Sequence, residues 1–159
     1  MAVELDDLDR GILAILSREA RTPVSQIADQ IKLSRPAVAE RIEKLERSGL
    51  IRGTTAVIDP AAIGRAVTAF IAARGPTFDA KQWKRFRELM DGDDEILEVH
   101  TVAGDDCFFI KVRTDSITSL NVLVNKLSAP PLSLSTRTTI VMKTHCEKHG
   151  GITLGEEER

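Results

Sequence analysis

A basic stretch between residues 32 and 52 holds the side chains best suited to recognising another molecule. It carries six basic and three acidic side chains, whereas the whole chain has a net charge of -2. Arginine reads guanine with two hydrogen bonds, and lysine and arginine pair with phosphates. The stretch therefore predicts a confined contact with duplex DNA, with a solvated helix face as the alternative. The candidate residues are Ser34, Arg35, Pro36, Ala37, Glu40, Arg41, Lys44, Arg47 and Arg52.

Metal binding and catalysis have less support in the sequence. His145, Cys146 and His149 lie close together, and His100 or Cys107 would have to complete a zinc site. Their spacing matches no common zinc pattern, so we predict no metal and no cofactor. The sequence contains no P-loop, no dinucleotide-binding glycine motif and no G-x-S-x-G. We therefore expect a binding protein and not an enzyme.

Three short helices are expected to position the basic stretch. Apolar residues recur at helical spacing three times before residue 50. Ser34 is a good N-cap for the third helix, and Gly49 follows its last periodic residues. The second and third helices are joined by a very short turn, which is typical of a helix-turn-helix. The expected buried face of the third helix is Val38, Ile42 and Leu45.

The second half of the chain alternates between strand and helix patterns. Strands are expected at residues 67–73, 96–102, 107–113 and 134–142. The order βαββαβ predicts a ferredoxin-like sheet with two helices on one face. Asp115 is the expected cap of the second of these helices. The expected helix residues facing the sheet are Trp83, Phe86, Leu89 and Met90, then Ile117, Leu120, Leu123, Val124 and Leu127.

The sheet face opposite the two helices also needs a layer that covers it. The strands at 67–73 and 96–102 carry apolar residues on both faces. An apolar face left in water would be unfavourable, so we predict that a second subunit covers it. The chain is therefore expected to form at least a homodimer.

Composition narrows the class of protein. The chain has 159 residues, of which 29% are charged and 42% hydrophobic, as in ordinary globular proteins of one or two domains. The two cysteines suit a reducing compartment. No apolar run approaches the roughly 18 residues of a membrane span, and the acidic start shows no signal peptide. We expect a cytoplasmic protein without a membrane partner.

Residues 5–64 closely resemble the N-terminal domain of the Lrp/AsnC (feast/famine) family of transcription regulators. The matching pieces are LDxxDxxIL, LSxxxVxxRIxxLExxGLIxG and the following strand with Asp-Pro, while Lys32 stands where the family often has glycine. The resemblance implies an α+β regulator that binds specific DNA sequences. Residues 1–52 would form a winged-helix-like helix-turn-helix domain and residues 53–65 a hinge strand and linker. Residues 66–145 would form the βαββαβ effector and oligomerisation domain, and residues 146–159 a tail.

The resemblance also implies an effector pocket between the effector domains of neighbouring dimers. The family loop GDxDY corresponds here to GDDCFF, so Cys107 stands in place of the second aspartate and Phe108 in place of the tyrosine. Backbone N–H groups at a glycine turn can hold a carboxylate, and an aspartate can hold an ammonium group. The expected effector is therefore an amino acid, with an unliganded polar turn as the alternative. The expected pocket residues are Thr101, Val102, Ala103, Gly104, Asp105, Asp106, Cys107, Thr139, Ile140 and Val141.

The expected partners are duplex DNA, a small-molecule effector and further copies of the chain. In the resembling family, dimers often assemble further into tetramers or octamers. An alternative within the same fold is an architectural protein that wraps or bends DNA without an amino-acid effector. The cysteine at position 107 keeps this alternative open.

Overall fold

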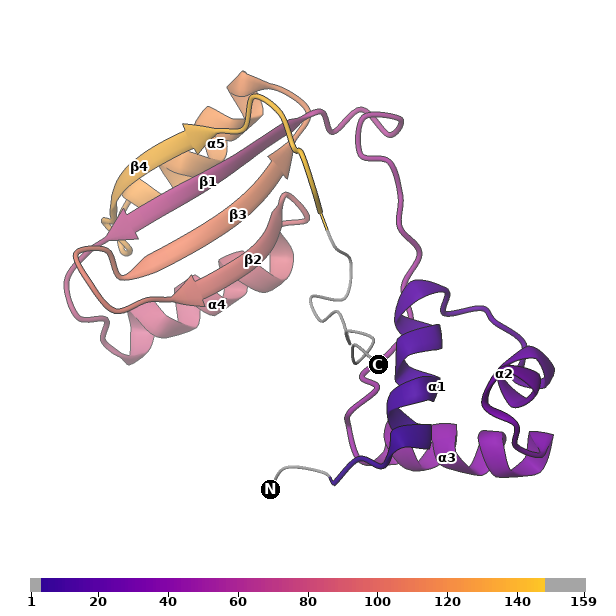
Figure 1. Cartoon of the computed structure of the whole chain (residues 1–159). Helices are drawn as coiled ribbons and strands as arrows, with labels where there is room; N and C mark the ends of the chain where they lie inside the picture. Colours follow the sequence, from indigo (N-terminus) through magenta and orange to yellow (C-terminus); the bar gives the residue numbers. More distant parts are fainter. Residues whose placement is uncertain (1–3, 148–159) are drawn as a thin grey trace. The chain divides into compact units, whose positions relative to one another are not determined.

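The computed structural model describes residues 4–147, which fold into two compact units (Figure 1). One unit ends at Val57 and the other spans Ile58–His145. The expected tail at residues 146–159 lies almost wholly outside the described residues, as does His149 of the considered zinc cluster. Within residues 4–147, no group of three or more His, Cys, Asp or Glu side chains is placed to hold a metal ion. In the same range, no helix is long and apolar enough to cross a membrane.

The first unit is a three-helix bundle, as the apolar spacing predicts. Its core contains Ile12, Ile27, Val38 and Leu45, which are at most 2% exposed. Ile42, expected on the same face as Val38, is only partly buried. Each fully buried side chain of this size contributes roughly 1.5–3 kcal/mol to folding. The helices are α1 (Asp7–Arg18), α2 (Val24–Ile31) and α3 (Arg35–Arg47).

Short polar side chains fix the starts of α1 and α3. The Asp6 carboxylate accepts a hydrogen bond from the backbone N–H of Asp9, and the Asp9 carboxylate accepts one from the N–H of Asp6. This reciprocal pair is a capping box. The Ser34 hydroxyl accepts a hydrogen bond from the N–H of Ala37, so the predicted cap of α3 is confirmed. Gly49 ends the helix with a φ of 76°, where glycine is favoured.

The turn between α2 and α3 contains a left-handed residue that is not glycine. Lys32 has a φ of 56°, and the next N–H, that of Leu33, donates to the carbonyl of Ala28 at 3.0 Å. A lysine in this conformation costs on the order of 1 kcal/mol relative to glycine. The helix-turn-helix therefore keeps its turn although the favoured residue is missing.

The prediction of a hinge strand is wrong. Residues 54–58 form no strand, although Thr54, Thr55, Val57 and Ile58 are β-branched. A strand requires a hydrogen-bonded neighbour, and none of the described strands pairs with this segment. A turn follows this segment, because the N–H of Gly64 donates to the carbonyl of Ala61 at 3.0 Å.

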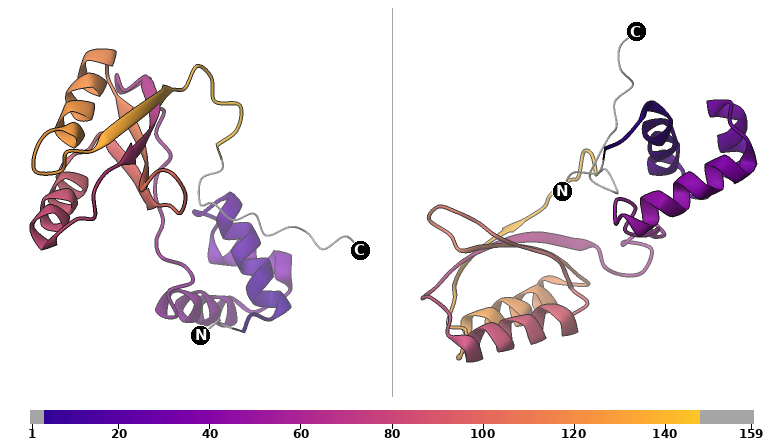
Figure 2. Two further views of the ribbon diagram at one scale, coloured as in Figure 1. Left: turned by 90° about the vertical axis from the view of Figure 1, so that its left-hand side faces the viewer. Right: turned by 90° about the horizontal axis from the view of Figure 1, so that it is seen from below.

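The second unit has the predicted βαββαβ order. Its four strands form one antiparallel sheet in the order β2-β3-β1-β4. Figure 2 shows both helices on the same face of this sheet. The elements are β1 (Val67–Arg74), α4 (Ala80–Gly92), β2 (Ile96–Thr101), β3 (Phe108–Thr114), α5 (Ile117–Ser128) and β4 (Ser135–Ile140).

The core of this unit lies between the sheet and the two helices. Ile71, Ile110 and Val112 point inward from β1 and β3 and are fully buried. Leu123 and Leu127 of α5 meet them from the helix side. Because side chains alternate along a strand, the residues between these inward positions face away from the helices.

The start of α5 differs from the sequence prediction. Ser116, and not Asp115, caps the helix by accepting a hydrogen bond from the N–H of Ser119. The Asp115 carboxylate instead accepts a hydrogen bond from the hydroxyl of Ser119. Ile117 thus becomes the first residue of the helix and is 55% exposed, although it was expected to be buried.

The sheet face without helices carries both aromatic and charged side chains. Phe70 of β1 and Phe109 of β3 are 44% and 41% exposed. The expectation of apolar residues on both faces of the strand at 96–102 is met only in part, because Leu97 is 43% exposed while β2 presents Glu98 and His100 on the open face. A register irregularity between Ile96 and Glu98 sets which residues of β2 point outward.

Candidate functional site

The outer face of α3 is the first candidate site. Val38 and Leu45 point into the core, so the remaining sides of the helix meet solvent. Most of the residues predicted to contact DNA are exposed, while Ala37 and Arg41 are partly buried. The exposed ones are Ser34, Arg35, Pro36, Glu40, Lys44, Arg47 and Arg52.

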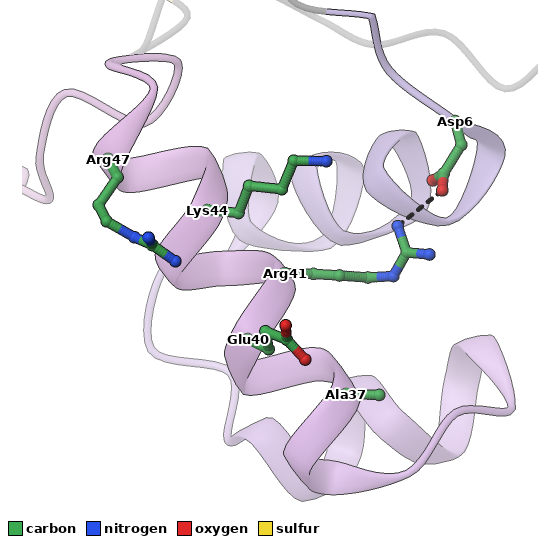
Figure 3. A pocket seen from close by; sticks show the side chains of 6 residues that line it. All are labelled: Asp6, Ala37, Glu40, Arg41, Lys44 and Arg47. Atoms are coloured by element: carbon green, nitrogen blue, oxygen red, sulfur yellow. Dashed lines mark hydrogen bonds and ion pairs between the residues drawn. The ribbon is translucent and has the colours of Figure 1, made fainter.

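A hollow of about 570 Å³ runs along this face of the helix (Figure 3). Arg47 lies at one side of it, 3.6 Å from Glu43 in a well-exposed ion pair. Pairs of this kind contribute little to stability, so the Arg47 charge remains available to a phosphate. The lining residues are Asp6, Ala37, Glu40, Arg41, Lys44 and Arg47.

Arg41 differs from its basic neighbours because it is paired inside the chain. Its Nη1 atom lies 2.7 Å from Oδ2 of Asp6 and 2.7 Å from Oδ1 of Asp9. Figure 3 shows the side chain extended toward Asp6. The Arg41 side chain is 28% exposed and that of Asp9 only 5%. Arg41 therefore lies on the predicted face, but its charge is engaged by two carboxylates of α1.

The electrostatics of this cluster follow from its hydrogen bonds. The backbone N–H of Asp9, followed by the guanidinium of Arg41, lowers the pKa of Asp6 below its ordinary value. Hydrogen bonds to Asp6 and Asp9 raise the pKa of Arg41. The Asp6 carboxylate and the Arg41 guanidinium therefore both stay charged near neutral pH.

Sequence reasoning missed the two acids as part of the site. The LDxxD spacing places Asp6 and Asp9 at the start of one helix, and this much is readable from the sequence. Their contact with Arg41 joins residues 35 and 32 positions apart. Only the packing of α1 against α3 creates it.

The loop between β2 and β3 is the second candidate site. It forms the expected turn, with Gly104 at a φ of 136°. The N–H of Val102 donates to the carbonyl of Cys107 at 3.0 Å, and the N–H of Cys107 donates to the carbonyl of Ala73 at 2.9 Å. Asp105 is exposed at the tip of the turn. The loop therefore lies against the end of β1.

The second acid of this loop has a partner that the sequence did not reveal. The Oδ2 atom of Asp106 lies 3.0 Å from Nη2 of Arg137 on β4, and the two side chains are 18% and 74% exposed. Arg137 is opposite Ala72 in the register of β1 and β4, which brings it near the loop. The Asp106 carboxylate is thus compensated within the chain, whereas Asp105 points to solvent without such a partner among residues 4–147.

One chain does not bring the two predicted halves of the effector pocket together. The N–H of Cys107 donates a hydrogen bond to the carbonyl of Ala73 near the end of β1. In contrast, Thr139 is opposite Phe70, and the N–H of Val141 donates to the carbonyl of Thr68. Three to five residues of β1 separate these points, which is roughly 10–17 Å along a strand. Thr101, Val102 and Ala103 lie on the loop side, and Ile140 lies with Thr139 and Val141.

The comparisons with known proteins agree with both halves of this description. A winged helix-turn-helix DNA-binding model matches residues 5–52, and an Lrp/AsnC ligand binding domain model matches residues 68–150. An HTH-type transcriptional regulator of Pyrococcus abyssi is 34% identical over 147 residues, covering 92% of this chain and 95% of the relative. The chain belongs to the Lrp/AsnC family. It is a DNA-binding transcriptional regulator with a ligand-binding domain, and not an enzyme.

Solved structures of Lrp/AsnC proteins have the same architecture. The structure of Escherichia coli AsnC is 32% identical and covers 91% of this chain and 97% of its own, with a TM-score of 0.79. A transcriptional regulator of Neisseria meningitidis, solved as a complex with L-Met, has a TM-score of 0.84 at 18% identity. It covers 92% of this chain and 95% of its own, and at that identity it supports the fold.

Proposed function

We propose that this Lrp/AsnC regulator reads duplex DNA in the major groove with the outer face of α3. The observation that carries the proposal is the exposed, Ser34-capped start of α3 beside the basic residues Lys44 and Arg47. In a helix-turn-helix, the N-terminal residues of the second helix reach base edges, and later basic residues meet phosphates. Arg35 is therefore the base-reading residue. The contact set is Ser34, Arg35, Pro36, Ala37, Glu40, Lys44, Arg47 and Arg52.

The test of this assignment compares Arg35→Ala with Lys44→Ala on a duplex enriched from a random pool by the wild-type protein. Loss of a base contact costs about 1–3 kcal/mol and relaxes specificity at one position. Loss of a phosphate contact weakens all duplexes alike and lowers the slope of log affinity against log salt by about 0.9. Lys84→Ala on α4 is the matched control, since this lysine is exposed but belongs to the other unit. Unchanged binding by both α3 variants would exclude α3 as the reading helix.

The regulator acts as an oligomer whose chains meet through the open sheet face. Phe70 and Phe109 are large apolar side chains that lie exposed in the middle of their strands. A second copy that packs the same face against them would bury both. Two-fold symmetry would then present two copies of α3 to a roughly palindromic site. Further association of dimers to tetramers or octamers supplies the second chain that the effector pocket needs. Such a regulator works where the chromosome lies, in the cytoplasm.

The effector is a free amino acid held at the β2–β3 loop. Gly104 has a φ of 136° in an exposed turn, where backbone N–H groups can hold a carboxylate, and the exposed Asp105 can hold an ammonium group. A regulator of the same fold from Neisseria meningitidis was solved as a complex with L-Met. Because the two groups of predicted pocket residues are separated within one chain, a neighbouring chain completes the site.

A screen of common amino acids by thermal unfolding tests this effector. A ligand at 100 times its dissociation constant adds about 2.7 kcal/mol per site. Asp105→Ala is expected to abolish the shift without unfolding the protein, and size-exclusion chromatography of each hit reports the change in assembly. An Asp105→Ala variant with unchanged ligand affinity would exclude the carboxylate as an amine receptor.

One observation favours an architectural role without an amino-acid effector. Asp106 is already paired with Arg137, and Cys107 supplies no second carboxylate. If no amino acid shifts the unfolding temperature while long DNA fragments are wrapped, this second function replaces the first.

A further inference from the structure

We propose that Arg41 is a positioning residue, which together with Asp6 and Asp9 fixes the angle of the DNA-reading helix against α1. The proposal rests on α3 being the helix that enters DNA. It changes the role predicted for Arg41, because the residue acts on DNA through the helix that carries it and not by touching the DNA.

The geometry of the three side chains is the first argument. Each carboxylate of the α1 capping box uses one oxygen on the backbone of α1 and turns the other toward Arg41. A single atom, Nη1, bridges both oxygens at 2.7 Å. Rotation of α3 about its own axis would displace Arg41 from at least one of the two carboxylates. The cluster therefore ties the start of one helix to the middle of the other.

Burial is the second argument. Asp9 is 3% exposed as a residue, so its charge has little contact with water and needs a permanent partner. Within residues 4–147, Arg41 is the cation that contacts it. If Arg41 turned outward to a phosphate, the Asp9 charge would be left buried and unpaired, which is strongly unfavourable. The cost of releasing Arg41 therefore keeps its side chain paired with Asp6 and Asp9.

Charge at the DNA face is the third argument. Asp6 is 51% exposed in its side chain and lines the same hollow as Lys44 and Arg47. Beside a phosphate, an uncompensated Asp6 would repel the DNA. Arg41 neutralises it, so the hollow keeps a basic character while α3 keeps its angle.

Asp6→Asn gives a test in which the two roles predict opposite signs. Asparagine caps helices as well as aspartate does, so α1 keeps its start while the ion pair is lost. If Arg41 contacts DNA, removing an acid that restrains it strengthens binding. If Arg41 positions α3, we expect affinity for the enriched duplex to fall three- to tenfold, with binding to random-sequence duplex unchanged or slightly tighter.

Asp7→Asn is the matched control. Asp7 is the next residue, is exposed and carries the same charge, but it makes no contact with Arg41. It reports the effect of the lost negative charge alone. Affinity of Asp6→Asn equal to or tighter than that of Asp7→Asn would overturn the proposal. Failure of the wild-type protein to enrich any duplex would instead count against the proposed function of α3.

Arg41→Gln provides a second, independent readout. A phosphate-contacting arginine contributes about 0.9 to the slope of log affinity against log salt, and its loss lowers the slope by that amount. A positioning arginine leaves the slope of random-sequence binding unchanged while the preference for the enriched duplex collapses. Circular dichroism confirms that the variant is folded before its slope is compared. A slope lowered by about 0.9 with the preference retained would overturn the proposal.

Discussion

The outer face of α3 and the β2–β3 loop differ in how much of each recognition surface a single chain supplies. The α3 surface is complete within residues 4–52, because its cap, its core contacts and its ion pairs all come from three neighbouring helices. The loop surface is incomplete, because its acid Asp106 is compensated internally and the other expected pocket residues lie further along β1. The comparison teaches that local sequence builds the proposed DNA-reading surface, whereas the proposed ligand-binding surface depends on strand register and, in our proposal, on a second chain.

The strongest test of this comparison is a substitution that introduces a charge on the open sheet face. Phe109→Lys places an unpaired charge where a second copy should bury an aromatic ring, which costs about 3–5 kcal/mol. We expect the dissociation constant of the dimer to rise at least about 100-fold, measured by analytical ultracentrifugation. Val122→Lys on α5, at a position 51% exposed on the helix side, is the control. A dimer unaffected by Phe109→Lys would show that the chains meet elsewhere.

The independence of the two units is tested by cavities in their cores. Ile27 and Ile110 are both fully buried, one in each unit. Ile27→Ala and Ile110→Ala should each cost about 2–5 kcal/mol. We expect Ile27→Ala to weaken DNA binding while the oligomer persists, and Ile110→Ala to disrupt the oligomer. Differential scanning calorimetry compares the unfolding of the two units in each variant. An equal shift of the whole unfolding profile by either variant would contradict the independence of the units.

A smaller effect is expected at the turn of the helix-turn-helix. Lys32→Gly removes the strain of a left-handed lysine and should stabilise the first unit by about 0.5–1 kcal/mol. Lys32→Ala keeps a side chain in the same conformation and should give no such gain. Urea unfolding followed by helix content compares them. A glycine variant less stable than wild type would show that the lysine side chain itself stabilises the turn.

The smallest expected effect is a pH dependence on the sheet face. Hydrogen bonds from His100 and then Lys111 lower the pKa of Glu98 below its ordinary value of 4.5. A lowered folded-state pKa stabilises the protein above pH 4.5, and this contribution disappears as pH falls through the folded-state pKa. Because Glu98 is 47% exposed, the contribution is about 0.2–1 kcal/mol. Glu98→Gln should therefore be less stable than wild type at pH 7, and urea unfolding should show this difference disappear as the pH falls well below 4.5.

Much of the fold was predictable because its signals are local. The N-cap at Ser34 lies three residues before the N–H that it caps, and the apolar positions recur at helical spacing. Both signals depend only on the geometry of one helix. The hinge strand at 54–58 failed for the opposite reason, since β-branched residues favour an extended backbone but cannot supply the neighbour that makes a strand. Ser116 replaced Asp115 as a cap because two adjacent polar residues both suit the position.

The candidate sites divide in the same way. The sequence by itself determined the exposed face of α3 and the glycine turn at Gly104, because helix period and turn preference act over a few residues. The tertiary structure alone decided that Arg41 is engaged by Asp6 and Asp9 and that Asp106 is engaged by Arg137. These pairs join residues more than 30 positions apart. Only helix packing and strand register bring such charges within 3 Å, and no spacing in the sequence encodes that distance.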